Sequence, residues 1–310
     1  MDNPQRVGDA GAMQPDPLTS PDTLSDALAE TAYLADDGLA TVTWLAHTLQ
    51  RPLLLEGEPG TGKTALAEAM ADLVDVPLIR LQCYEGIEAS QALYDWDFPR
   101  QILHLRAVEA LAQKATAGQR VEELEAELFD ERFLQARPVL QALRAAPCVL
   151  LVDEIDRADD EFEAFLLEVL STWSVSIPEL GVVAAETPPF VVLTSNRTRE
   201  LHDALKRRCL YHWIEHPGLE RELAIVRARL PEVEETLARE VVTLVQQLRD
   251  DETLVKPPGV AETLDWARAL TALGQSRLDP EVAATTMGAA VKYREDAERV
   301  RVALDRMLTR

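Results

Sequence analysis

The chain has 310 residues, 47% of them hydrophobic, so it can bury a sizeable core, and its length suits about two domains. Its formal net charge of −23 disfavours nucleic acid and anionic membranes as partners. No segment approaches the roughly 20 apolar residues of a membrane span, and the N-terminus lacks the apolar region of a signal peptide. Cys83, Cys148 and Cys209 are far apart and lack metal-ligand spacing, so we expect ordinary free thiols in a reducing cytoplasm.

The first half of the chain predicts a tail followed by alternating helices and strands. Residues 1–21 are rich in proline and poor in large apolar side chains, which is typical of a disordered tail. The first helix is expected to begin at Asp22 or Thr23 as its cap. Apolar spacing predicts strands over 53–56 and 78–81, and helices over 23–35, 39–49, 101–117, 121–129 and 138–145.

The second half of the chain predicts more strands and then only helices. Residues 148–152 are a continuous apolar run, typical of a strand buried on both faces of a parallel sheet. Further elements are expected as a hairpin over 175–184, strands over 190–193 and 210–214, and helices over 201–207, 219–230, 232–249 and 260–273. The chain therefore divides into a tail over 1–21, a strand–helix domain over 22–217 and a helical domain over 218–310.

A glycine-rich turn between the first strand and the next helix fits the phosphate-binding pattern G-x-x-x-x-G-K-[ST]. Its residues are Gly57, Glu58, Pro59, Gly60, Thr61, Gly62, Lys63 and Thr64. Glycines let backbone N–H groups turn inward around a polyphosphate, and the following helix points its N-terminus at the same anion. Lys63 is expected to hold the β- and γ-phosphates of a nucleotide, and the Thr64 hydroxyl to bind Mg²⁺.

Polar residues at later strand and helix ends extend this site. Asp153 and Glu154 end an apolar strand; Asp153 is expected to hold Mg²⁺ and Glu154 to activate the attacking water. Asn196 ends another apolar strand, so parallel packing would place its amide beside Asp153, where it could orient that water. Arg207 and Arg208 follow a short helix, and an arginine delivered across a subunit interface would stabilise charge in phosphoryl transfer. Each group alone also fits an ordinary turn or surface role.

Four segments taken together resemble the AAA+ ATPases of the MoxR family. They are residues 57–64, 151–158, 195–197 and 207–209. Residues 81–86 and 194–201 are similar to the CoxD-like branch of that family, and the resemblance runs from about residue 25 to residue 300.

The resemblance implies an α/β P-loop NTPase fold, in which an αβα core with a parallel five-stranded sheet is followed by an all-helical lid domain. ATP would bind between neighbouring subunits of a ring, usually a homo-hexamer. The hairpin over 175–184 would be the family's insert in the helix after the Walker B motif. The implied site residues are Lys63 and Thr64 in Walker A, Asp153 and Glu154 in Walker B, Asn196 as sensor 1, and Arg208 as the finger arginine with Arg207 as the fallback.

The sequence departs from the family pattern at two positions. Asp156 stands where the family usually has asparagine. The lid helix carries Glu262 where a sensor 2 arginine is normal, so either Arg268 further along that helix substitutes, or the lid does not sense the γ-phosphate through an arginine.

The resemblance implies a cytoplasmic, Mg-ATP-driven chaperone that matures or activates a metalloenzyme, often with a partner containing a von Willebrand factor A domain. For the CoxD-like branch, the implied client is a molybdenum hydroxylase such as carbon monoxide dehydrogenase. Two alternatives stay open: a nucleic-acid motor or clamp-loader-like subunit, which the charge disfavours, and a non-hydrolysing nucleotide-dependent scaffold, which Asp153 and Glu154 disfavour. The loop aromatics Tyr94, Trp96 and Phe98 fit either a client contact or packing of the loop onto the core.

Overall fold

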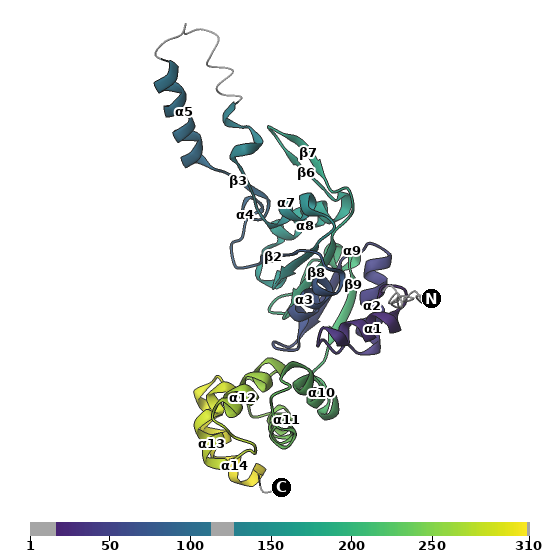
Figure 1. The fold of residues 1–310 in the computed structure, drawn as a ribbon, viewed down its shortest axis with the longest axis vertical. Helices are drawn as coiled ribbons and strands as arrows, with labels where there is room; N and C mark the ends of the chain where they lie inside the picture. The colour runs from purple at the N-terminus through teal and green to yellow at the C-terminus, as the bar shows by residue number, and fades with distance from the viewer. Residues whose placement is uncertain (1–16, 113–126, 309–310) are drawn as a thin grey trace, which may run out of the picture.

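The chain folds around a five-stranded parallel sheet with the order β2-β5-β8-β1-β9 (Figure 1). The computed structural model describes residues 17–112 and 127–308. The strands of the sheet are β1 (Leu53–Gly57), β2 (Leu78–Gln82), β5 (Val149–Asp153), β8 (Phe190–Ser195) and β9 (Leu210–Ile214). Because the strands are parallel, the carboxyl ends of β1, β5 and β8 meet at one edge of the sheet.

Helices cover both faces of the sheet, because successive strand residues point to opposite faces. Leu53 and Leu55 pack in one apolar cluster, whereas Leu54 between them packs in another. The first cluster is covered by α1 (Pro21–Glu30), α2 (Asp37–Thr48) and α3 (Lys63–Val74). The second is covered by α4 (Ala89–Leu93), α7 (Pro138–Ala145), α8 (Asp160–Thr172) and α9 (Asp203–Arg208). The predicted αβα core with a parallel five-stranded sheet is confirmed.

The N-terminal region departs from the predicted tail. Residues 1–16 lie outside the described part of the chain, but residues 17–21 belong to the fold. The indole N–H of Trp44 donates to the carbonyl of Leu18 over 2.8 Å, and α1 begins at Pro21. The prediction of disorder over 17–21 was wrong because proline is favoured in the first turn of a helix, where its missing N–H needs no partner.

The first helix also begins and ends earlier than predicted. Its N-cap is Ser20, whose hydroxyl accepts a hydrogen bond from the Thr23 N–H over 3.2 Å, so neither Asp22 nor Thr23 is the cap. The Thr23 hydroxyl in turn accepts from the Ser20 N–H over 2.9 Å, which completes a reciprocal cap. The helix ends at Glu30.

The aromatic segment predicted as a loop is partly a strand. β3 (Tyr94–Trp96) pairs antiparallel with β4 (Leu134–Ala136), and α5 (Phe98–Ala112) follows it. The helices predicted over 101–117 and 121–129 lie partly outside the described residues.

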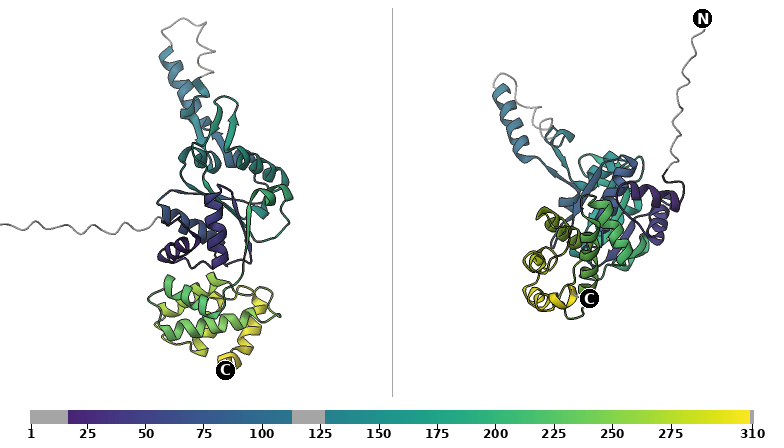
Figure 2. Two further views of the ribbon diagram at one scale, coloured as in Figure 1. Left: turned by 90° about the vertical axis from the view of Figure 1, so that its right-hand side faces the viewer. Right: turned by 60° about the horizontal axis from the view of Figure 1, so that its bottom comes forward.

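A second hairpin projects beside this segment. It consists of β6 (Ser174–Ile177) and β7 (Gly181–Ala184), as predicted for residues 175–184. Figures 1 and 2 show α5 and this hairpin at the end of the core that lies opposite the C-terminal helices.

After β9 the described chain is helical and has an apolar cluster of its own. The segment between Ile214 and Leu219, where we predicted the domain boundary, connects β9 to the first of these helices. The helices are α10 (Leu219–Arg229), α11 (Glu235–Arg249), α12 (Val260–Ala272), α13 (Pro280–Thr286) and α14 (Arg294–Leu308). In the described ranges, no helix combines the length and apolarity needed to cross a bilayer.

Candidate nucleotide-binding site

The glycine-rich turn closes around the side chain of its own lysine. The Lys63 ammonium donates to the carbonyls of Gly57 and Glu58, each over 2.8 Å. Gly60 and Gly62 have φ values of +78° and +94°, a region that favours glycine, which explains why the turn needs them. Burial lowers the pKa of Lys63 to about 8, against the opposing effect of nearby carboxylates.

Asp153, a predicted metal ligand, lies at the end of β5 beside Thr64, the other one. One of its carboxylate oxygens accepts the Thr64 hydroxyl over 3.0 Å and the Thr194 hydroxyl over 2.5 Å, and the other accepts the Arg80 guanidinium over 2.5 Å. Carboxylate and hydroxyl oxygens suit Mg²⁺, which takes its other ligands from phosphates and water in nucleotide sites. Thr64 and Asp153 therefore fit this ion. Within the described ranges, no cluster of three or more His, Cys, Asp and Glu residues forms a separate metal site.

Glu154 is held in a left-handed backbone conformation at the end of β5, with φ of 56°. Its N–H donates to the Thr194 hydroxyl over 2.9 Å. Its carboxylate accepts the amides of Gln82 over 3.3 Å and Asn196 over 3.5 Å. The parallel pairing of β5 and β8 thus brings Asn196 to the acidic pair, as the sequence predicted, although its amide contacts Glu154 and not Asp153. Such a strained residue is typical of a functional site.

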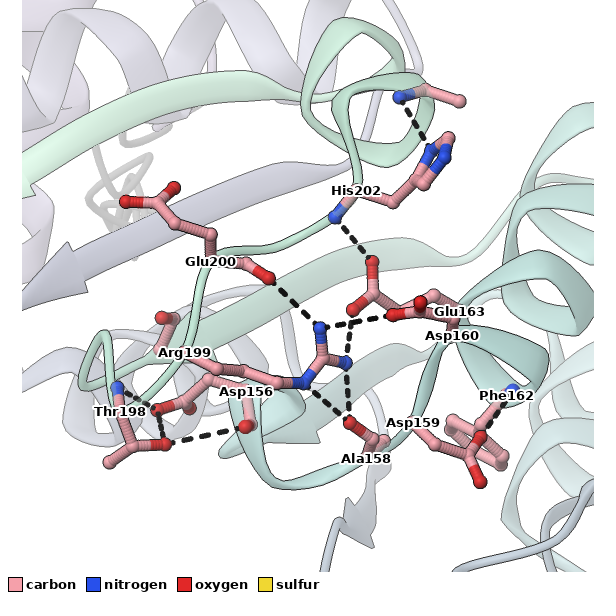
Figure 3. A network of polar contacts seen from close by, with 12 residues as sticks. Asp156, Ala158, Asp159, Asp160, Phe162, Glu163, Thr198, Arg199, Glu200 and His202 are labelled. Atoms are coloured by element: carbon pink, nitrogen blue, oxygen red, sulfur yellow. Dashed lines mark hydrogen bonds and ion pairs between the residues drawn. The ribbon is translucent and has the colours of Figure 1, made fainter.

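The loop after Asn196 is fixed by a buried carboxylate at one of the positions that depart from the family pattern. Asp156 is 2% exposed and accepts the N–H groups of Asn196 over 3.3 Å and Thr198 over 2.8 Å. It also accepts the Thr198 hydroxyl over 2.7 Å (Figure 3). All of these groups donate hydrogen bonds to the two carboxylate oxygens of Asp156. An asparagine there would accept at one oxygen only and would place an NH2 donor at the other position.

A second buried acid anchors the far end of the same loop. Glu163, which is 1% exposed, pairs with the Arg199 guanidinium and accepts the His202 N–H over 2.8 Å. Arg199 also donates to the carbonyl of Ala158 over 2.8 Å (Figure 3). These contacts tie the loop to the chain that follows Glu154, so the positions of Asn196 and Glu154 are coupled.

A cavity of about 460 Å³ lies between the core and the C-terminal helices. Lys63, Thr64, Asp153, Glu154 and Asn196 all line it. So do Pro59, Gly60, Thr61 and Gly62 of the predicted phosphate-binding turn, whereas Gly57 and Glu58 do not. The opposite wall includes Tyr33 and Leu34 of the core and Ile225, Arg229 and Leu264 of the C-terminal helices.

The C-terminal helices approach the turn without an arginine at the expected position. Glu262 accepts the Gly259 N–H over 2.9 Å, which caps α12, and the Ala261 N–H donates to the carbonyl of Gly60 over 3.3 Å. Arg268 pairs with its helix neighbour Asp265 over 3.4 Å and is absent from the cavity wall.

The cations that the C-terminal helices do bring to the cavity come from α10. Arg221 donates to Asp36 and to the carbonyl of Leu34, over 2.8 and 2.9 Å, and so joins α10 to the core. Arg229 is exposed at the end of the same helix.

The arginine pair lies away from this cavity. Arg208 donates to the carbonyls of Leu170 and Ser171 at the end of α8, over 3.1 and 3.0 Å, while Arg207 is exposed. Arg51 donates to the backbone carbonyls of both arginines, over 2.8 and 2.9 Å, and so holds the end of α9. The structure therefore does not bring Arg208 to the other predicted residues of its own chain.

Several residues at or beside the cavity were missed by the sequence analysis. Arg80 lines the cavity from β2, beside β5, and reaches Asp153. Gln82 on the same strand does not line it but reaches Glu154. A lone arginine among the apolar residues of a strand was the available signal for Arg80. Arg229 gave no signal, because its position depends on how α10 sits against the core.

The sequence analysis also predicted free thiols and gave two possible roles for the aromatic residues at 94, 96 and 98. All three cysteines are free and buried, as expected, and burial raises the pKa values of Cys83, Cys148 and Cys209 to about 12, 11 and 12. Trp96 packs edge-on against Tyr94 and Phe129, at 6.1 and 5.3 Å between ring centroids, which supports a packing role for Tyr94 and Trp96, whereas Phe98 is exposed.

The sequence matches the ATPase family associated with various cellular activities (AAA) over residues 53–214, about half of the chain. The chain therefore belongs to this family and is an ATP-hydrolysing P-loop enzyme.

Three similar proteins match this chain over only part of their own length. Nuclear valosin-containing protein-like of Mus musculus is 28% identical over 164 residues, which cover 51% of this chain and 14% of that protein. Midasin of Giardia intestinalis is 36% identical over 100 residues, covering 32% of this chain and 2% of midasin. An uncharacterized protein of Staphylococcus aureus (strain USA300) is 26% identical over 166 residues, covering 52% of this chain and 54% of that protein. The chain thus spans at most about half the length of these relatives.

Similar solved structures include the RuvB Holliday junction branch migration motor of Thermotoga maritima, with a TM-score of 0.44 and 16% identity over 86% of this chain and 70% of that one. The FIGL-1 AAA domain in complex with ADP has a TM-score of 0.38 and 20% identity over 72% of this chain and 62% of that one.

Proposed function

We propose that the chain is a MoxR-type ATPase that uses Mg-ATP hydrolysis to remodel or activate another protein. The observation that supports this most directly is the meeting of Lys63, Thr64, Asp153, Glu154 and Asn196 around one cavity. No single element supplies these groups: the turn after β1, the end of β5 and the end of β8 each contribute.

Each residue has a distinct role in this proposal. Lys63 exchanges its contacts with loop carbonyls for the β- and γ-phosphates of ATP, with the turn's backbone N–H groups around the same anion. Thr64 and Asp153 would hold Mg²⁺, which would supply positive charge at the phosphates. Glu154 accepts a proton from the attacking water, and Asn196 orients that water from the neighbouring strand.

The finer points extend the resemblance to the MoxR family and its CoxD-like branch. We propose a homo-hexameric ring in the cytoplasm, in which Arg208 of one subunit reaches the γ-phosphate bound by the next. The proposed partner has a von Willebrand factor A domain, and the proposed client is a metalloenzyme such as a molybdenum hydroxylase. The 1–21, 22–217 and 218–310 division is part of this proposal, amended by the ordered residues 17–21.

The experiment is a Glu154→Gln variant of the full chain. It should bind ATP normally and hydrolyse it about 10²- to 10⁴-fold more slowly, because the water loses its base while Asp153 and Lys63 remain. Glu168→Gln, an exposed glutamate on α8, is the matched control and should hydrolyse ATP at the wild-type rate. Unchanged hydrolysis in Glu154→Gln would contradict the assignment.

The same variant tests the client. Held in its ATP-bound form, tagged Glu154→Gln should retain a metalloenzyme that wild type releases, identified by mass spectrometry and metal analysis. If Glu154→Gln retains no protein and DNA stimulates ATP turnover by the wild-type chain, the chaperone role is contradicted and a nucleic-acid motor is favoured.

A further inference from the structure

Arg80 makes an ion pair with Asp153, the carboxylate that we propose as a ligand of Mg²⁺. Arg80 lies on β2, whose register places Gln82 beside Asp153 on β5. Its guanidinium donates to Asp153 over 2.5 Å and to the Gln82 amide oxygen over 2.7 Å. Arg80 is the only ion-pair partner of Asp153 in the part of the chain that the structure describes.

The contact uses the oxygen of Asp153 that no hydroxyl occupies. One oxygen already accepts Thr64 and Thr194, and Arg80 takes the other. A Mg²⁺ ion bound to this oxygen would use its second lone pair, but the ion would then lie beside the Arg80 guanidinium, whose positive charge repels it. Arg80 and Mg²⁺ therefore compete for Asp153.

The Arg80–Asp153 pair is more exposed to solvent than an ion pair that fixes structure. The Arg80 side chain is 51% exposed and lines the cavity, while Asp153 is 5% exposed. By contrast, the Arg249–Glu222 pair of the C-terminal helices is 7% and 0% exposed, with Glu222 also accepting the Thr263 hydroxyl. A buried pair of that kind fixes structure, whereas a half-exposed arginine can leave its partner without losing much packing.

The pair also matters before the metal arrives. The carboxylates of Asp153, Glu154 and Asp156 all act electrostatically on Lys63, so they would repel the phosphates of incoming ATP. Arg80 neutralises the first of these acids while the metal is absent. Removing Arg80 would therefore weaken metal-free nucleotide binding and ease Mg²⁺ binding at the same time.

We propose that Arg80 is an exchangeable counter-ion of Asp153: it holds the carboxylate in the nucleotide-free chain and yields it to Mg²⁺ when the metal enters with ATP. This rests on the nucleotide site proposed above. It makes Arg80 a positioning residue that acts through Asp153 and couples metal entry to nucleotide binding.

The test measures how much Mg²⁺ strengthens nucleotide binding. The Kd of the non-hydrolysable analogue AMP-PNP is measured by calorimetry on the full chain, once in EDTA and once in excess MgCl2. The Kd in EDTA divided by the Kd in MgCl2 is then compared between variants. In Arg80→Met the ratio should rise roughly tenfold, the factor expected from one charge-assisted hydrogen bond. Arg80→Lys keeps the charge and should remain close to wild type.

The matched control is Arg137→Met, since Arg137 is exposed to a similar degree, 45%, and makes an ion pair with Asp95 outside the cavity. Its ratio should equal that of wild type. A ratio in Arg80→Met that falls, or that stays within about twofold of wild type, overturns the proposal. If wild type itself fails to bind AMP-PNP in both buffers, the nucleotide site is wrong, which is a separate result.

Discussion

The core and the C-terminal helices contribute different chemistry to the same cavity. The core supplies Lys63, Arg80, Asp153 and Glu154, and most of the ionisable groups on the cavity wall come from it. The helices supply Ile225, Leu264 and two cations, Arg221, which is paired with Asp36, and Arg229, which is exposed. We infer that the core carries the reaction and that the helices close over the nucleotide.

The difference follows from how the two parts are built. Parallel strands end at one edge, so residues far apart in sequence meet there with their polar groups directed to the same place. The helices instead turn their amphipathic faces inward to build their own core, as the apolar stripe of α11 shows. Among the described C-terminal helices, α10 and the start of α12 reach the cavity, so we expect core substitutions to have the larger effects.

The largest effect should come from a core residue that acts on a neighbouring subunit. We expect Arg208→Ala to bind ATP and fold normally but to hydrolyse ATP about 10³- to 10⁵-fold more slowly, since that is the range for a finger arginine. Steady-state hydrolysis at saturating ATP measures it. Within one chain Arg208 only caps the end of α8, and losing that cap alone would change the rate little.

Mixing subunits tests the trans role. Arg208→Ala mixed with Lys63→Ala should regain activity, because an intact Arg208 then faces an intact glycine-rich turn, provided that labelling first shows subunit exchange. Arg207→Ala is the comparison, since Arg207 is exposed and adjacent. A severe loss in Arg207→Ala with near-normal Arg208→Ala would move the finger to Arg207.

A smaller effect should appear as a pH dependence of the core site. Burial lowers the pKa of Lys63 to about 8 in the nucleotide-free chain, and bound phosphates would raise it again. The affinity for ATP is therefore full well below pH 8 and declines as pH rises through that value, by about tenfold between pH 7 and pH 9.

Calorimetry across this range measures the decline. Lys63→Arg serves as control, because a guanidinium stays charged, so its affinity should be flat with pH whatever its absolute value. A wild-type affinity that does not change up to pH 9 would contradict a titrating Lys63.

What the sequence could predict follows the same division. The turn around Lys63 and the acids after β5 were predictable, because a local pattern sets their backbone geometry and strand direction brings them together. Asn196 was predictable for the same reason. Arg80 requires knowing that β2 pairs with β5, and Arg229 requires knowing where α10 docks, neither of which a local pattern encodes.

The tail prediction failed at a smaller scale. Prolines near residue 21 suggested disorder, yet one of them starts α1, because the meaning of a proline depends on the cap before it. Asp156 shows the opposite case: its departure from the family pattern was visible in the sequence, but its contacts with the Asn196 loop were not.

The smallest effect on ATP binding should come from substitutions in the C-terminal helices. It shows whether α10 or α12 supplies a cation to the nucleotide. Arg229 lines the cavity from α10 and is exposed, while Arg268 on α12 pairs with Asp265 and is absent from the cavity wall. We expect Arg229→Met to weaken ATP binding by about threefold, the scale of one exposed charge contact, and Arg268→Met to leave it unchanged. Calorimetry on both variants measures this. Glu262 caps its own helix at the position where the resemblance to the MoxR family implies an arginine. A larger loss in Arg268→Met than in Arg229→Met would show that α12 still delivers the cation when the helices close.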